Sequence, residues 1–61
     1  MFFLMKDDVV VSFEEGRHNN VRVIETRANV VIENEWLERI EARDMWRYYV
    51  VNGFERIDSD E

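Results

Sequence analysis

The chain has 61 residues, of which 46% are apolar and 36% are charged, and it contains no cysteine and no proline. This length allows one domain with a thin core, and the lack of cysteine excludes disulfides and thiolate zinc sites. His18 is the only histidine, which excludes a histidine-based metal cluster as well. Self-association or binding to another macromolecule is therefore the expected further source of stability.

The net charge of −6 is unevenly placed. Between residues 16 and 57 the arginines and the acidic residues cancel, so the surplus lies in residues 6–15 and 58–61. Direct binding to a nucleic-acid backbone needs a basic face, so this distribution disfavours it. A basic partner protein is easier to accommodate.

The beginning of the sequence lacks the basic region of a signal peptide. No apolar run approaches the ~18 residues that a membrane-spanning helix needs. Together with the absence of cysteine, these features lead us to expect a cytoplasmic protein with no membrane partner.

Alternation of apolar and polar residues predicts strands over residues 9–13, 21–26 and 30–32. The polar stretch 14–20, with one glycine and two asparagines, is typical of a loop or wide turn. Residues 2–5 add a fourth strand or extend the first. The predicted fold class is α+β: an antiparallel meander of three or four strands with one helix, as a single domain over residues 1–61.

A helix is predicted over residues 35–43, where the period changes. Asn34 is suited to cap its first turn, and Glu35 suits the positive end of the helix dipole. Trp36, Leu37 and Ile40 would then share the buried face.

Two interpretations are open for residues 44–57. Trp46, Tyr48 and Val50 alternate with Arg47, Tyr49 and Val51. Asn52-Gly53 follows, a pair that strongly favours a two-residue turn, so we favour a C-terminal β-hairpin. The alternative is a helix extended to about residue 52, with Gly53 as a left-handed C-cap and Phe54 packing back. The acidic tail, residues 58–61, is expected to fray.

The residues needed for catalysis are missing. Ser12 lies inside a predicted strand, Ser59 lies in the acidic tail, and His18 lies in a polar loop, so no nucleophile has a base beside it. Neither glycine belongs to a phosphate-binding motif, and the acidic residues lack calcium-loop spacing. We expect no enzymatic activity, no cofactor and no metal.

Aromatic residues and arginines crowd into the second half of the chain, and these residue types dominate binding hot spots. On the favoured hairpin, Arg47 and Tyr49 share one face and form the expected contact pair. Acidic residues near the start would steer the protein toward a basic surface. The predicted partner-binding residues are Arg43, Trp46, Arg47, Tyr49, Asp7 and Asp8.

These observations favour a small non-enzymatic module that occupies a surface of a larger protein, such as an inhibitor or accessory factor of the kind that phages and mobile elements encode. That partner would be a nucleic-acid-handling protein in one version. An alternative is a dimeric nucleic-acid-binding regulator, similar to an antitoxin, that gathers arginines 17, 22 and 27 on one ribbon. A further alternative is a structural subunit of an assembly. A homodimer would protect an open sheet edge.

Overall fold

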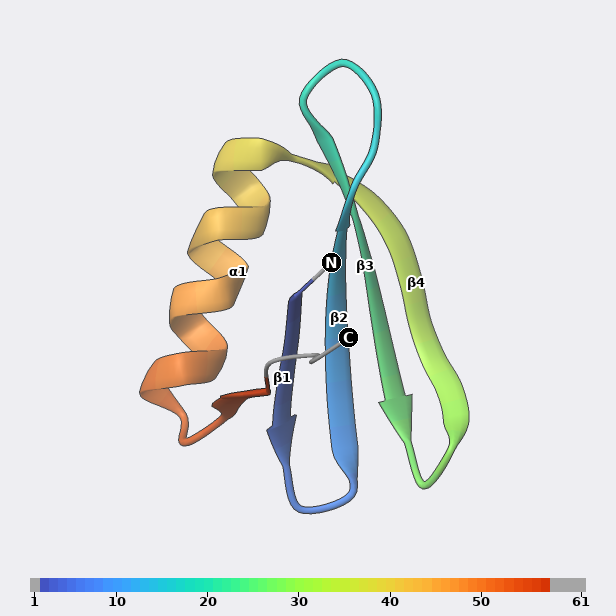
Figure 1. The fold of residues 1–61 in the computed structure, drawn as a ribbon, viewed down its shortest axis with the longest axis vertical. Coiled ribbons are helices and arrows are strands. Elements are labelled where there is room, and N and C mark those ends of the chain that lie inside the picture. The colour runs from blue at the N-terminus through green and yellow to red at the C-terminus, as the bar shows by residue number, and fades with distance from the viewer. Residues whose placement is uncertain (1, 58–61) are drawn as a thin grey trace.

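The structure is a computed structural model that describes residues 2–57, so the predicted tail at 58–61 lies outside the described residues. Five strands and one helix follow one another along the chain (Figure 1). They are β1 (Phe2–Lys6), β2 (Val9–Glu15), β3 (Asn20–Arg27), β4 (Val30–Glu38), α1 (Arg39–Val51) and β5 (Glu55–Ile57).

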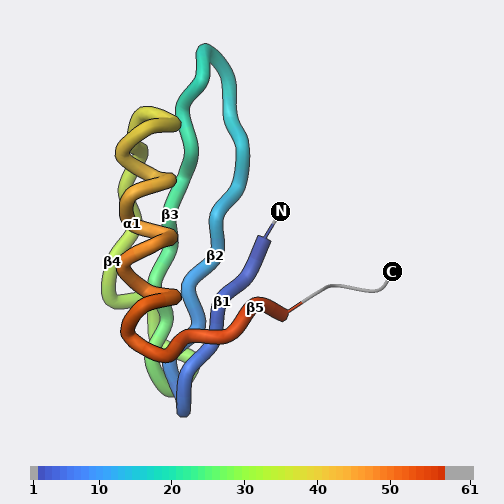
Figure 2. Tube along the Cα trace, turned by 90° about the vertical axis from the view of Figure 1, so that its left-hand side faces the viewer, coloured from blue at the N-terminus to red at the C-terminus, as the bar shows by residue number. Residues whose placement is uncertain are grey.

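The strands form one antiparallel sheet in the spatial order β4-β3-β2-β1-β5. The first four strands make a meander, and α1 then crosses one face of the sheet, so that β5 pairs with β1 at the opposite edge (Figures 1 and 2). The predicted α+β class is confirmed, as is a fourth strand over residues 2–5. Within residues 2–57, no helix has the length and apolar character needed to cross a membrane.

Strand alternation decides which side chains the helix covers, because successive residues point to opposite faces. The register places Leu4 beside Val11 and Phe13 beside Val23, all on the face against α1. The buried core consists of six side chains: Leu4, Val11, Phe13, Val21, Val23 and Ala42. This core is thin, and the opposite face of the sheet has no layer over it among the described residues.

The predicted helix start is wrong, because residues 35–38 continue β4 instead. Glu35 pairs with Val23 and Leu37 pairs with Val21, so the strand matches the full length of β3. Asn34 lies within the strand, and Glu38 takes the N-cap position. The Glu38 backbone N–H donates to the Glu41 carboxylate at 3.2 Å. Cross-strand pairing thus outweighs the local capping preference of Asn34.

The favoured C-terminal hairpin is also wrong, and the alternative, a helix extended to about residue 52, is confirmed. Gly53 ends α1 with φ 97°, and its N–H donates to the Val50 carbonyl at 3.1 Å. The Phe54 N–H donates to the Tyr49 carbonyl at 3.0 Å, which completes a Schellman cap. The ring of Phe54 packs back on Tyr49 with 4.8 Å between centroids. The Asn-Gly pair therefore ends a helix here instead of forming a hairpin turn, and that helix covers the apolar face of the sheet.

The turn between β3 and β4 contains a strained residue. Ala28 and Asn29 have φ values of 52° and 66°, the left-handed pair that a tight hairpin turn requires. Asparagine tolerates this region, whereas the Cβ of alanine costs about 1–2 kcal/mol there. The Ala28 N–H donates to the Asp8 carbonyl at 3.0 Å, which ties this turn to the turn between β1 and β2.

Candidate functional site

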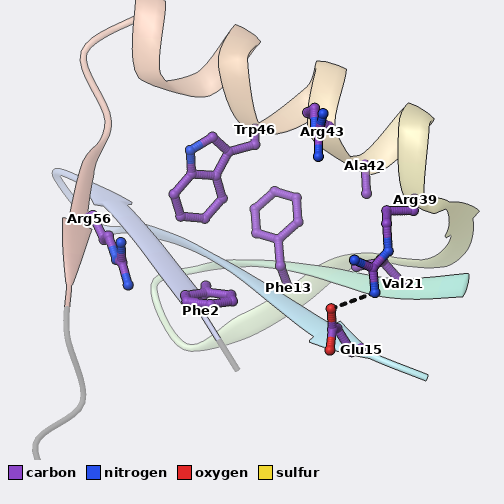
Figure 3. Close-up of a pocket in the computed structure, with 9 residues that line it drawn as sticks. All are labelled: Phe2, Phe13, Glu15, Val21, Arg39, Ala42, Arg43, Trp46 and Arg56. Atoms are coloured by element: carbon purple, nitrogen blue, oxygen red, sulfur yellow. Dashed lines mark hydrogen bonds and ion pairs between the residues drawn. The ribbon is translucent and has the colours of Figure 1, made fainter. Parts of the chain in front are cut away.

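An apolar pocket of about 320 Å³ lies between α1 and the sheet, where it is lined by residues of β1, β2, β3 and β5 (Figure 3). Its floor is aromatic and aliphatic, and its rim carries arginines. We call it the Phe2–Trp46 pocket; its lining residues are Phe2, Phe13, Glu15, Val21, Arg39, Ala42, Arg43, Trp46 and Arg56.

The floor is built around Trp46. Its ring meets Phe13 at 5.2 Å and Phe2 at 6.1 Å between centroids, both edge-to-face, an arrangement that aromatic pairs prefer. The β1–β2 register places Phe2 directly opposite Phe13. Ala42 precedes Trp46 by four residues and therefore shares its helix face. The small Ala42 side chain leaves the space beside Phe13 that becomes the pocket (Figure 3).

Three arginines line the rim from two elements (Figure 3). Arg39 forms an ion pair with Glu15 at 2.7 Å. The guanidinium of Arg56 lies 4.9 Å from the centroid of the Phe2 ring, a cation–π contact. Arg43 is exposed, and within residues 2–57 no carboxylate pairs with it.

The pocket lining combines two kinds of side chain. Among residues 2–57, its members are apolar apart from Arg39, Arg43, Arg56 and Glu15. An apolar floor beside guanidinium groups fits a ligand that combines an apolar body with a negative charge.

The predicted partner-binding residues lie in three places. Arg43 and Trp46 both line the Phe2–Trp46 pocket. Arg47 is exposed on α1 outside the lining, and Asp7 with Asp8 forms the turn between β1 and β2. Their contact with a partner stays a prediction.

Tyr49 lies on the inner side of α1, so it does not form the exposed pair with Arg47 that the hairpin implied. Its hydroxyl donates to the Glu25 carboxylate at 3.1 Å. Burial, and after it the nearby charge of Glu25, raise the pKa of Tyr49 from 10.0 to about 12. Two residues along a helix point about 200° apart, whereas along a strand they share a face, so the hairpin interpretation produced this error.

Sequence reasoning missed most of the pocket. Phe2, Phe13, Arg39 and Arg56 come from four different elements, and only the sheet register and the β1–β5 pairing bring them together. One signal was present in the sequence: strand alternation across the short β1–β2 turn places the two phenylalanines at matching positions.

A second surface is the sheet face opposite α1, which we call the open face. The register places seven apolar side chains on it: Phe3, Met5, Val10, Ile24, Val31, Trp36 and Ile57. Trp36 is 56% exposed and Val31 is 57% exposed. On the same face, the Arg22 Nε–H donates to the Asn34 carboxamide oxygen at 3.1 Å.

Within the described residues, no group of three or more histidines and acids is placed to hold a metal ion. No protein-family model, curated protein or solved structure matches this chain. The functional proposals below therefore rest on its residues and their geometry.

Proposed function

We propose that this chain is a small, non-enzymatic protein-binding module that lays its open face on an apolar surface of a larger cytoplasmic protein. The observation that carries this proposal is the open face itself. Four of its apolar side chains, Met5, Val31, Trp36 and Ile57, are at least 38% exposed. Exposed apolar side chains gathered on one face mark interaction sites in folded proteins.

The composition of the open face supports a protein partner. Trp36, the largest side chain on it, is of a type enriched in binding hot spots. Glu14 and Trp36 lie on either side of Arg22 in the strand register, so polar side chains of both signs adjoin Trp36, as at the rim of a protein interface. The net charge of −6 adds long-range attraction toward a basic surface and raises the association rate.

A protein partner is favoured over a nucleic acid by the positions of the arginines. Arg22 lies on the open face, while Arg27, five residues later in β3, lies on the face that holds Val21 and Val23. A single basic ribbon would require both on one side. In its specific form, the proposal is that this chain is an inhibitor or accessory factor that blocks its partner by occupying one of the partner's surfaces.

The test is an affinity capture with two charge-matched variants. Tagged wild-type protein, Val31→Lys/Trp36→Ala and Ile40→Lys/Val51→Ala are each incubated with lysate of the source or host cell, with nuclease and graded salt. Ile40 and Val51 are 74% and 84% exposed on the helix and lie outside the open face. Circular dichroism confirms that each variant is folded.

We expect one large protein to be retained by the wild type and by the helix variant, and to be lost by the open-face variant. Equal retention by all three would refute the open face as the contact. Recovery of nuclease-sensitive material would favour the nucleic-acid regulator, and recovery of the bait alone would favour a homodimer or assembly subunit.

A further inference from the structure

We propose that the Phe2–Trp46 pocket binds a small amphipathic carboxylate, a molecule with a short apolar tail and one carboxylate. This site is separate from the open face and does not depend on the proposed function.

The size and lining of the pocket set the apolar part of the ligand. Its volume of about 320 Å³ lies at the lower end of the range of about 300–1,000 Å³ for small-molecule sites. Below the rim, the walls are the rings of Phe2, Phe13 and Trp46 with Val21 and Ala42. An apolar space of this kind offers water few hydrogen-bond partners, so a short hydrocarbon tail or a single ring gains by entering it.

The arginines at the rim determine the charged group of the ligand. Arg43 lines the pocket and is exposed, with no carboxylate paired to it among residues 2–57. A guanidinium binds a carboxylate through two parallel hydrogen bonds. Arg39 and Arg43 are four residues apart on α1, a spacing at which like charges repel. Glu15 already neutralises Arg39, so a bound carboxylate would neutralise the remaining charge of this pair, on Arg43.

The same rim selects for a single negative charge. Glu15 also lines the pocket and remains paired with Arg39, so a second anionic charge on the ligand would meet a carboxylate. A phosphate monoester is therefore disfavoured. Because Arg39 is held by its ion pair with Glu15, Arg43 is the rim arginine that would pair with the ligand.

The test is a titration of the ¹⁵N-labelled chain with octanoate, with 1-octanol and octylammonium as probes that share the tail. We expect octanoate to shift the backbone resonances of Ala42 and Arg43 and the indole N–H resonance of Trp46. We expect it to bind at least ~5-fold more tightly than 1-octanol, and octylammonium to bind weakest, because only the carboxylate pairs with the rim.

Two variants with the same change of charge locate the effect. Arg43→Gln should weaken octanoate binding about 1.5- to 5-fold and leave 1-octanol binding unchanged, as expected for the loss of one exposed ion pair. Arg27→Gln, at the end of β3 and outside the lining, should change neither. Both residues are exposed, so both variants are expected to fold.

Three results would overturn the proposal. These are no saturable shifts with octanoate, equal affinities for octanoate and octylammonium, or equal losses in Arg43→Gln and Arg27→Gln. In a Trp36→Phe background, Trp46 is the only tryptophan, so its fluorescence gives an independent measure of occupancy.

Discussion

Replacement of Tyr49 by phenylalanine should destabilise the protein at neutral pH and remove a defined part of its alkaline sensitivity. The Tyr49 hydroxyl donates to the Glu25 carboxylate at 3.1 Å in a partly buried position. A hydrogen bond to a charged group contributes about 1.5–3 kcal/mol, and partial exposure reduces this to about 1 kcal/mol. For a domain of this size, that loss lowers Tm by about 4–8 °C.

The pH dependence follows from the pKa of Tyr49, which is raised to about 12 from 10.0. The folded state thus holds the phenol proton more tightly than the unfolded state. The contribution of the protonated Tyr49 phenol to the free energy of unfolding is fully present below pH 10 and is lost as the pH rises toward 12. Two pKa units correspond to at most about 2.7 kcal/mol, and solvent screening reduces this to about 1 kcal/mol.

The assay is urea unfolding of the wild type and Tyr49→Phe at several pH values between 7 and 12. We expect the difference in unfolding free energy to be about 1 kcal/mol below pH 10 and to shrink toward zero as the pH approaches 12. Tyr48→Phe is the matched control, because Tyr48 is 64% exposed, and it should change stability by less than about 0.5 kcal/mol. A difference that does not depend on pH would refute the reasoning.

Three further substitutions test the fold. Gly53→Ala should lower the urea midpoint by the equivalent of about 1–2 kcal/mol, because the C-cap residue has φ 97°; an unchanged midpoint would contradict the cap assignment. Ala28→Gly should stabilise by about 0.5–1 kcal/mol, since relief of left-handed strain exceeds the added backbone entropy; thermal unfolding would show a higher Tm, and a lower one would count against strain. Trp46→Ala should cost about 3–5 kcal/mol, close to the whole stability of so small a core. Near-UV circular dichroism should then be lost, whereas Trp36→Phe should keep it, and a folded Trp46→Ala variant would show that the pocket floor is dispensable.

The strands could be predicted because their alternation is local. Residues 9–13, 21–26 and 30–32 all lie within strands, and only the lengths were too short. The two errors arose where a local signal competed with a distant contact. Asn34 has the chemistry of an N-cap, yet pairing with Ile24 keeps it in β4. The Asn52-Gly53 pair fits a hairpin turn, yet here it ends α1, because the residues before it pack as a helix on the core face of the sheet.

The candidate site was predictable only in part. Arg43 and Trp46 stood out by residue type, and both line the pocket. Phe2 and Arg56 stood outside the prediction because they reach the pocket through the pairing of β1 with β5, more than fifty residues apart in the sequence. Nothing in the composition of a single segment encodes such a pairing, whereas the packing of α1 across the sheet enforces it.

β4 is an edge strand of the sheet, and its charged side chains affect how two copies of this chain could pair. Glu33 and Glu35 lie on the same face of this strand and are both exposed. In a two-fold antiparallel pairing of β4 with its copy, each of the three central registers places Glu33 against Glu33, Glu33 against Glu35, or Glu35 against Glu35. Like charges directly opposite each other destabilise such ladders. The edge therefore resists fibre-like growth from identical chains, while an extended segment with basic residues at alternate positions would meet no such barrier.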